Sequence, residues 1–393
     1  MRIVITGATG LLGRNLLLES FKRYWATTGE LEIFALGRDN SSAPLKARLE
    51  AIAGSEGPDY LGLPADTSAP WMDRWRRCVV AMPFDLERDD LALSVGHLEA
   101  LRQTPIDVFI HAAGSTDLRP GADVQSHVHR INLEGTRRLL ALLNRLPVKR
   151  LAHVGSAYAV GMSAVGQADS KSDFRNPYER SKSQAESMIA AFGAECAIPC
   201  TIFRPAALCG RLLEQPLGST CKFDTIYGWA AFFFREKRRL AVESVTRGAH
   251  NVEMPIRIAA GSRAALNIVP VDYAAKTLLD ACRSEGAFSV LPIVNPKSTP
   301  IRQMIGWVFE FLAVNGYQIV QEEPEDKNDL ESRYYRSIGR TLAPYMTGEP
   351  PHFDVSRLED LERRTGGRCP RIDGGSFARL LDHASKRSFG LVG

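Results

Sequence analysis

Short hydrophobic runs alternate with longer segments of helical periodicity through the first half of the chain. Six runs have the length and composition of strands, at residues 2–6, 31–36, 78–82, 107–111, 150–154 and 200–204. Between them, segments such as 121–145 and 178–195 carry hydrophobic residues at helical spacing. Because strands that alternate with helices form parallel sheets, the pattern predicts a doubly wound α/β fold with its site at the carboxyl ends of the strands.

This alternation ends near residue 205. Residues 206–264 contain an aromatic run from Phe223 to Phe234, followed by the basic run Arg235–Arg239, and we expect this segment to begin a smaller lobe. Breakers between Gly54 and Pro70 predict a loop. The acidic stretch 321–328 predicts a linker or an exposed turn.

The first strand-like run leads directly into a glycine-rich turn, Thr6-Gly-Ala-Thr-Gly-Leu-Leu-Gly13. Gly7 permits a tight turn, Gly10 lets the backbone approach a diphosphate, and Gly13 lets the following helix pack on the strand. The N–H groups at the start of that helix then face the phosphates. The turn predicts a dinucleotide site, although an ordinary strand-to-helix turn can carry the same glycines.

A tyrosine, a lysine and a serine form a second pattern. Tyr178 is the one tyrosine of the chain with a lysine, Lys182, four residues later, and this spacing places both side chains on one face of a helix. Ser156 follows the strand-like run 150–154. Because a lysine cation favours the phenolate, Tyr178 is predicted to exchange a proton with a substrate. An incidental pair on a surface helix is the alternative.

Together these motifs resemble the extended short-chain dehydrogenase/reductases, and within them the thioester-reductase and fatty-acyl reductase (male-sterility-type) branch. The segments that carry the resemblance are the glycine turn, Leu36-Gly-Arg38, Asp85-Leu86, His111-Ala-Ala-Gly114, Asn132-Leu-Glu-Gly-Thr136, Val154-Gly-Ser-Ala-Tyr158, Tyr178 with Lys182, Arg204-Pro205 and Leu266–Tyr273. The resemblance implies a Rossmann-type domain in residues 1–205, to which 265–290 return. The end of the strand and helix alternation predicts a substrate lobe in residues 206–264, and we expect the tail, residues 291–393, to form a helical cap over it.

The resemblance also implies roles for individual residues. Catalysis would rest on Ser156, Tyr178 and Lys182, with Asn132 supporting the lysine. The residues that would bind the cofactor are Thr6, Gly7, Thr9, Gly10, Leu11, Gly13, Arg14, Arg38, Arg48, Asp85, Leu86, His111, Ala112, Ala113, Gly114, Tyr178, Lys182, Arg204 and Pro205.

Two positions depart from the pattern of the branch. Gly155 stands where a hydroxyl residue is usual, and Phe84 stands where a glycine commonly precedes Asp-Leu. Neither change removes a predicted catalytic group. Both affect the expected choice of substrate, because these positions line or adjoin the site in the family.

The end of the second strand predicts which dinucleotide binds. An acidic residue there binds the ribose diol of NAD, whereas an arginine accommodates the 2′-phosphate of NADP. This strand ends in Gly37-Arg38, and the family has basic residues at positions matching Arg14 and Arg48. Asp39 follows one residue later, so NADH stays open, but we expect NADPH.

Composition and charge exclude several other classes. The net charge of +4 is small and spread along the chain, which argues against nucleic-acid binding. No apolar run approaches the length of a membrane span, and the first strand begins at once, so we expect a cytoplasmic protein. His127 and His129 point apart on a helix, so no metal site is expected.

The first functional hypothesis is reduction of an acyl thioester, carried by coenzyme A or by an acyl or peptidyl carrier protein, to an aldehyde or alcohol. An apolar pocket wall in the aromatic run beside a basic rim at Arg235–Arg239 suits such a substrate, although a packed core and a solvated helix face explain both runs equally well. A ketone, alcohol or sugar-nucleotide enzyme with the same residues is the alternative, and a non-catalytic nucleotide sensor is the third. Whether the protein forms a homodimer stays open.

Overall fold

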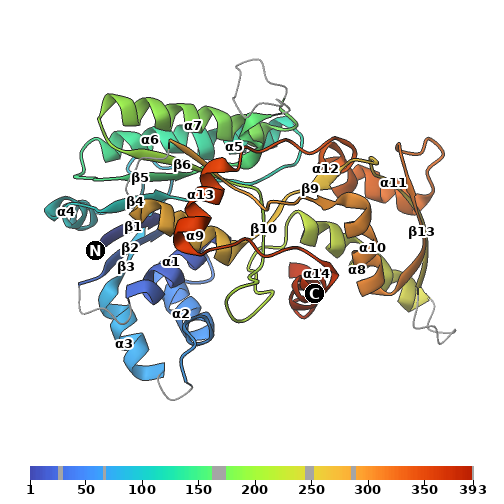
Figure 1. Ribbon diagram of the computed structural model, residues 1–393, viewed down its shortest axis with the longest axis horizontal. Helices are drawn as coiled ribbons and strands as arrows, with labels where there is room; N and C mark the ends of the chain where they lie inside the picture. The colour runs from blue at the N-terminus through green and yellow to red at the C-terminus, as the bar shows by residue number, and fades with distance from the viewer. Residues whose placement is uncertain (25–29, 65–67, 162–173, 244–251, 285–288, 392–393) are drawn as a thin grey trace.

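A seven-stranded parallel sheet forms the centre of the larger of two lobes in this computed structural model (Figure 1). The structure describes residues 1–24, 30–64, 68–161, 174–243, 252–284 and 289–391. In spatial order, the strands are β11 (Val290–Ile293), β6 (Cys200–Pro205), β5 (Leu151–Val154), β4 (Val108–His111), β1 (Arg2–Thr6), β2 (Glu32–Gly37) and β3 (Val79–Pro83). The prediction of a doubly wound sheet is confirmed, and six strands lie where the sequence predicted them. The edge strand β11 was not predicted.

Helices cover both faces of this sheet because successive side chains of each strand point to opposite sides. Ile3 and Ile5 of β1 are buried in one hydrophobic cluster, whereas Val4 is buried in the other. On the first face lie α1 (Leu11–Tyr24), α2 (Leu45–Leu61), α3 (Ser68–Cys78) and α9 (Val271–Arg283). On the second face lie α4 (Val95–Gln103), α5 (Ala122–Val128), a π-helical segment (His129–Glu134), α6 (Gly135–Leu143) and α7 (Pro177–Glu195) (Figure 1).

The predicted loop between Gly54 and Pro70 is wrong for most of its length. Helix α2 continues to Leu61, and α3 begins at Ser68. Tertiary packing explains why a helix tolerates Gly57 here: a Cβ atom at this position would lie 2.1 Å from Cζ2 of Trp71. The glycine therefore makes room for a buried tryptophan of α3, and packing overrides the low helix propensity of the segment.

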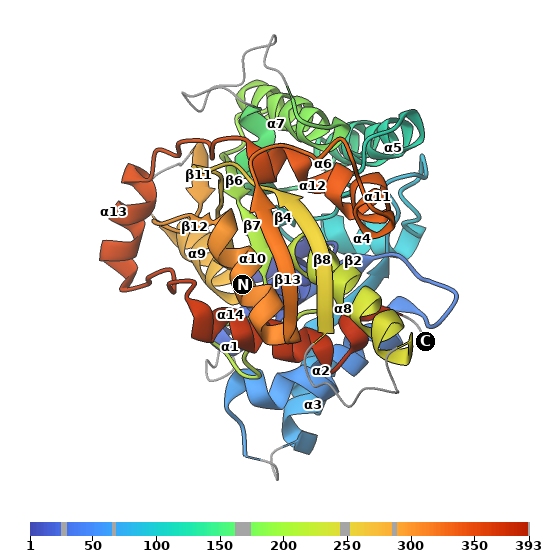
Figure 2. The same cartoon turned by 90° about the vertical axis from the view of Figure 1, so that its right-hand side faces the viewer.

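The smaller lobe packs helices around a two-stranded parallel sheet (Figure 2). The elements of this lobe are α8 (Ile226–Glu243), β8 (Val252–Ala259), α10 (Ile301–Leu312), β13 (Val314–Val320), α11 (Asp329–Arg336), α12 (Ile338–Thr347) and α14 (Gly374–Ser385). Two short pairs connect it to the larger lobe, β7 (Ala207–Cys209) with β10 (Ile268–Pro270) and β9 (Ala265–Leu266) with β12 (Thr299–Pro300). The stretch 321–328 is an exposed turn, as predicted.

The C-terminal segment crosses between the lobes twice (Figure 1). From α12 it runs to α13 (Ser356–Thr365), which packs on α9 and β11, and it then returns to α14. On the larger lobe, Tyr273 Oη donates a hydrogen bond to Glu362 Oε1 at 2.6 Å, and Asn295 Nδ2 donates to the Pro370 carbonyl at 2.9 Å. These contacts tie the two lobes together.

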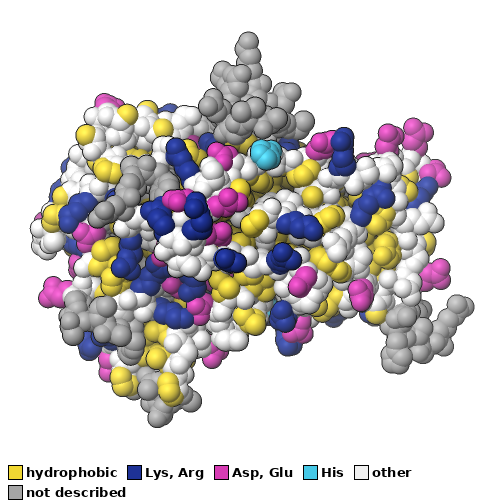
Figure 3. Space-filling view, in the orientation of Figure 1, with side chains coloured by type: hydrophobic (Ala, Val, Ile, Leu, Met, Phe, Trp, Pro, Cys, Tyr) yellow, Lys and Arg dark blue, Asp and Glu magenta, His cyan; other side chains and the backbone are white. Residues whose placement is uncertain are grey.

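The surface carries charges of both signs. On the face shown in Figure 3, Lys and Arg side chains are interspersed with Asp and Glu rather than gathered into one basic surface. Among the helices that the structure describes, none combines the length and the hydrophobicity needed to cross a bilayer.

Candidate active site

A cavity of about 390 Å³ lies between the carboxyl ends of the strands and the smaller lobe. The glycine turn, Ser156, Tyr178 and Lys182 line one part of it. A second part, which we call the apolar chamber, is lined by Trp229, Leu266, Ile301, Met304, Ile305, Val308, Leu342, Met346 and Phe377. The cavity therefore joins the predicted nucleotide site to a space suited to hydrocarbon.

The glycine turn has the close packing that its sequence predicts. Gly7 has a φ of +71°, a value that favours glycine. A Cβ atom at Gly13 would lie 2.1 Å from the Gly7 carbonyl oxygen, so glycine is needed for α1 to begin this close to β1. Helix α1 begins at Leu11, and the N–H groups of its first turn have no acceptor within the helix. This surface fits the diphosphate of a dinucleotide.

Thr6 connects the glycine turn to the segment after β4. Its Oγ1 accepts hydrogen bonds from the N–H groups of Ala112 and Ala113, both at 3.1 Å, and lies 2.9 Å from His111 Nδ1. Burial lowers the pKa of His111 to about 3, so the imidazole is neutral. These contacts hold the backbone of residues 111–113 beside the turn, where a dinucleotide would pass.

Arginines gather at the end of β2. Arg48 donates one hydrogen bond to Thr9 Oγ1 at 3.0 Å and another to the Arg38 carbonyl at 2.8 Å. The Arg38 guanidinium is 63% exposed and lies 3.6 Å from Glu87. Asp85 and Leu86 lie directly after β3, and Asp85 Oδ1 accepts from the Glu87 N–H at 3.0 Å. The ends of β2 and β3 thus bring Arg38, Arg48 and the predicted Asp85-Leu86 pair to one side of the turn.

The other two charged candidates at this end are already engaged. Asp39 Oδ1 accepts a hydrogen bond from the Leu45 N–H at 2.7 Å and so holds the first turn of α2. Arg14 forms an ion pair with Glu56 at 2.6 Å and donates to the Thr9 carbonyl at 3.1 Å. One oxygen of Asp39 therefore holds the start of α2, and Arg14 pairs with Glu56, a carboxylate that it shares with Arg211.

The three predicted catalytic residues meet at the centre of the cavity. Asn176 caps α7 by accepting from the Glu179 N–H at 3.0 Å, so the helix begins just before Tyr178. Tyr178 shares a side-chain hydrogen bond with Ser156. Lys182 Nζ donates to the Val154 carbonyl at 2.9 Å, which fixes the ammonium beside the end of β5. The structure thus brings Ser156, Tyr178 and Lys182 together.

Burial dominates the electrostatics of this group. It raises the pKa of Tyr178 to about 12, and the hydrogen bond from Ser156 only partly opposes this rise. It lowers the pKa of Lys182 to about 8; the carboxylate of Glu186 opposes this change and the ammonium of Lys222 adds to it. Tyr178 therefore holds its proton at neutral pH, whereas Lys182 can lose its charge at mildly basic pH.

Asn132 lies in the π-helical segment between α5 and α6. Its Oδ1 accepts from the Ser115 N–H at 2.8 Å, and its Nδ2 donates to the Ser115 carbonyl at 3.0 Å and to Ser181 Oγ at 2.9 Å. A Cβ atom at Gly114 would lie 3.0 Å from Asn132 Oδ1 and 3.4 Å from Lys182 Nζ. Asn132 thus braces the segment after β4 against α7, close to the lysine.

Glu186 belongs to this site and was missed by the sequence interpretation. It is buried one helical turn beyond Lys182, and its Oε1 accepts from the Ser156 N–H at 3.1 Å. Its Oε2 accepts from Arg204 Nε at 2.9 Å. Arg204 therefore turns toward Glu186, while Pro205 lines the cavity. The one available signal was an acidic residue four positions after Lys182 on the same helical face.

The aromatic run serves mainly as core. Phe232 and Phe233 pack edge to face with each other and are buried, whereas Trp229 both packs on Phe233 and lines the cavity. In the basic run, Lys237 donates to the Leu312 carbonyl at the end of α10. The basic run is thus partly structural, and of the aromatic side chains between Phe223 and Phe234, Trp229 is the one that lines the cavity.

Comparisons with known proteins agree with this architecture. The family described as male sterility protein, an NAD-binding domain, matches residues 5–278. Human fatty acyl-CoA reductase 2 is 27% identical over 159 residues, which are 40% of this chain and 28% of the length of that relative.

Solved structures match over almost the whole chain. The terminal R domain of the myxalamid PKS-NRPS pathway has a TM-score of 0.73 at 21% identity, covering 99% of this chain and 91% of that one. A thiolation-reductase di-domain from an archaeal non-ribosomal peptide synthetase has a TM-score of 0.62 at 17% identity, with coverage of 99% and 91%. At these identities the matches show a shared fold.

Proposed function

The chain belongs to the male sterility protein family of NAD-binding domains, with the fold of the extended short-chain dehydrogenase/reductases, and we propose that it is an NADPH-dependent reductase of acyl thioesters. One observation carries the proposal. A single cavity joins the glycine turn, the group of Ser156, Tyr178 and Lys182, and the apolar chamber. A hydride donor, a proton donor and a hydrocarbon chain can therefore meet in one place.

The choice of NADPH rests on the end of β2. Arg48 contacts both Thr9 and the backbone carbonyl of Arg38, where the adenosine ribose of a dinucleotide on this turn would lie, and the exposed side chain of Arg38 extends from the same strand end. Charge-assisted hydrogen bonds from guanidinium groups suit a 2′-phosphate. The acid that would favour NADH, Asp39, caps α2 instead. These contacts support NADPH over NADH.

In the proposed reaction, the bound dinucleotide supplies a hydride to the carbonyl carbon of the thioester. Ser156 donates a hydrogen bond to the carbonyl oxygen as negative charge develops there. Tyr178 donates its proton to that oxygen, and Lys182 stabilises the phenolate that is left. The resulting hemithioacetal breaks its C–S bond, and its hydroxyl proton passes to the departing thiolate. The products are an aldehyde and a thiol, and Tyr178 regains its proton from water, so that one hydride and one proton account for the two-electron reduction.

The apolar chamber favours an acyl substrate over a sugar nucleotide. Sugar hydroxyls need polar partners when buried, and the chamber is lined by Leu, Ile, Val, Met, Trp and Phe side chains. The names of relatives point the same way, since one is a fatty acyl-CoA reductase and another joins a reductase to a thiolation domain. We therefore propose a carrier-bound or CoA-bound acyl chain as substrate.

The deciding experiment follows oxidation of NADPH in the presence of acyl-CoA, an acyl thioester on a carrier protein, the matching aldehyde, and ketones of similar size. We expect both thioesters to be reduced faster than the ketones. Turnover of ketones alone would show that the thioester assignment is wrong while the proton-donor chemistry of Tyr178 stands.

A further inference from the structure

A second cation lines the cavity besides Lys182. Lys222 lies on the segment between β7 and α8, and its Nζ contacts the Thr116 hydroxyl and pairs with Asp224 Oδ2 at 2.8 Å. All three residues line the cavity. Thr116 follows β4 in the larger lobe, so this contact joins two parts of the cavity lining that are 106 residues apart in the sequence. The proposed chemistry of Ser156, Tyr178 and Lys182 gives Lys222 no role.

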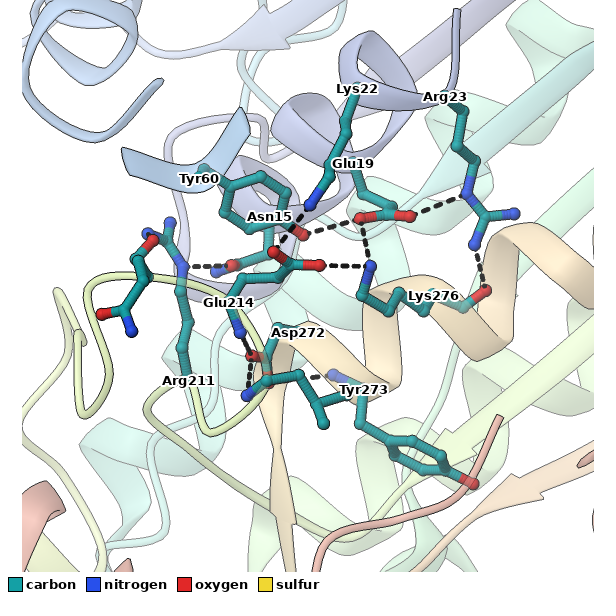
Figure 4. Close-up of polar contacts among 12 residues, drawn as sticks. Asn15, Glu19, Lys22, Arg23, Tyr60, Arg211, Glu214, Asp272, Tyr273 and Lys276 are labelled. Atoms are coloured by element: carbon teal, nitrogen blue, oxygen red, sulfur yellow. Dashed lines mark hydrogen bonds and ion pairs between the residues drawn. The ribbon is translucent and has the colours of Figure 1, made fainter. Parts of the chain in front are cut away.

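A buried polar network anchors residues 211–214, at the start of the segment that carries Lys222 (Figure 4). Asp272 accepts hydrogen bonds from the N–H groups of Leu213 at 2.6 Å and Glu214 at 2.8 Å. Arg211 donates to Asn15 of α1 at 2.7 Å. The segment is thus tied to both α9 and the helix that follows the glycine turn.

Ion pairs complete this attachment. Glu214 pairs with Lys22 of α1 at 2.7 Å and with Lys276 of α9 at 2.6 Å, and Lys276 also pairs with Glu19 at 3.0 Å (Figure 4). Glu19 and Glu214 are both largely buried. The start of the segment is therefore fixed on two sides. Closer to Lys222, the Thr220 hydroxyl accepts a hydrogen bond from the Lys222 N–H at 3.2 Å and donates one to the Lys222 carbonyl at 3.0 Å.

Lys222 and Thr116 offer the donors that a phosphate-binding site needs. An ammonium and a hydroxyl lie in contact and face the same cavity as the N–H groups that begin α1, and both are common donors to phosphate oxygens. Among the described residues that line the cavity, the charged side chains are Lys182, Lys222 and Asp224, so the lining carries a net positive charge. An anion entering here would replace the Thr116 contact and gain both donors.

We propose that Lys222 and Thr116 bind a phosphate group at the mouth of the cavity. Two molecules of the proposed reaction carry such a group: the dinucleotide, through its diphosphate, and the acyl donor, through the phosphate of a phosphopantetheine arm. This inference rests on the proposed function for the identity of those two molecules. The phosphate chemistry itself follows from Lys222, Thr116 and the adjacent helix start.

The test compares Lys222→Met with Lys222→Arg and with the control Lys149→Met. Lys149 pairs with Asp107 at 2.7 Å, much as Lys222 pairs with Asp224, but it precedes β5 at the end of the sheet opposite the site. Binding is measured by fluorescence for NADPH and by calorimetry for 2′-AMP, phosphopantetheine and pantetheine, the last two with NADP⁺ present. Thermal unfolding verifies that each variant is folded, and Thr116→Val serves as a second variant.

If Lys222 binds the diphosphate of the dinucleotide, Lys222→Met weakens NADPH binding about tenfold, the size expected for loss of a hydrogen bond to a charged group. The affinity for 2′-AMP, which lacks the diphosphate, then stays the same. If Lys222 binds the phosphate of the phosphopantetheine arm, the affinity for NADPH stays the same. The wild-type preference for phosphopantetheine over pantetheine then disappears in Lys222→Met. Lys222→Arg retains most of the binding in either case. The proposal would be overturned if Lys222→Met changed the affinities for all four ligands no more than Lys149→Met does. These measurements need no turnover. A result against the phosphate site is therefore distinguishable from a result against thioester reduction, which the NADPH oxidation assay tests.

Discussion

Glu186 Oε1 accepts a hydrogen bond from the backbone N–H of Ser156 at 3.1 Å, which couples a buried carboxylate of α7 to the predicted catalytic serine. The residue before the serine makes this possible. A Cβ atom at Gly155 would lie 1.9 Å from Glu186 Oε1, so any larger residue must displace the carboxylate. The departure of Gly155 from the usual hydroxyl residue thus has a structural explanation in this chain.

Replacing Gly155 with alanine should therefore damage both stability and turnover. We expect a loss of about 1–3 kcal/mol in the free energy of unfolding, because the new methyl group overpacks a buried site, and a lower kcat because Ser156 loses its anchor. Urea unfolding and kcat measurements test this. Gly54→Ala is the matched control, since a Cβ atom there meets no heavy atom within 4 Å, and we expect it to be neutral or slightly stabilising. Equal behaviour of the two variants would contradict the coupling.

Arg38→Ala should weaken NADPH binding about tenfold and leave the affinity for NADH unchanged. The reason is that the guanidinium is proposed to meet the 2′-phosphate, which NADH lacks. Fluorescence titration with both reduced cofactors measures the two dissociation constants. Asp39→Ala is the control, because it removes the acceptor for the Leu45 N–H at the start of α2, and it should lower stability without changing the preference between the cofactors. Equal affinity of the wild type for NADPH and NADH would sink the assignment.

Tyr178→Phe should reduce turnover by about 10²-fold or more and leave cofactor affinity nearly unchanged, since it removes the proton donor and little else. Steady-state kinetics and NADPH titration provide the two readouts. Lys182→Ala differs because its ammonium is also proposed to bind the nicotinamide ribose, so both turnover and NADPH affinity should fall. Undiminished turnover in Tyr178→Phe would place the chemistry on another residue.

The pH dependence should be set by Lys182. Its pKa is lowered to about 8, so its charge is present below this pH and lost above it, while Tyr178, with a pKa raised to about 12, keeps its proton throughout. We expect kcat/KM for thioester reduction to fall as the pH rises through about 8. Lys182→Arg, whose guanidinium stays charged, should lose this basic limb if it retains activity. A wild-type rate that stays constant well above this pH would show that the lysine charge is not required.

A carrier protein, if it delivers the substrate, should use the exposed part of the basic run. Because Lys237 contacts the end of α10, the useful charge reversals are Arg238→Glu and Arg239→Glu, both at exposed positions of α8. We expect the pair to raise KM for a carrier-bound substrate far more than for a small thioester mimic. The same change for both substrates would show that these arginines form only a solvated surface.

The amino-acid sequence was enough to determine the strands, the glycine turn and the pairing of the predicted catalytic residues. The strand runs, the spacing of Gly7, Gly10 and Gly13, and the pairing of Tyr178 with Lys182 depend on contacts within a few residues. Backbone geometry fixes such contacts locally, so a strand, a turn and one face of a helix follow from residue order. The doubly wound sheet and the location of the site at its carboxyl edge followed from these local patterns.

What depended on distant contacts could be decided only by the tertiary structure. Helix α2 continues through Gly57 because Trp71 fills the space beside it, and no local signal outweighs the glycines and proline of that segment. The convergence of Glu186 with Ser156 and Arg204 joins three elements separated in sequence. The contact of Lys222 with Thr116 is likewise a long-range contact. Sequence periodicity reports which face of an element is buried, but the partner on that face is chosen by packing of the whole chain.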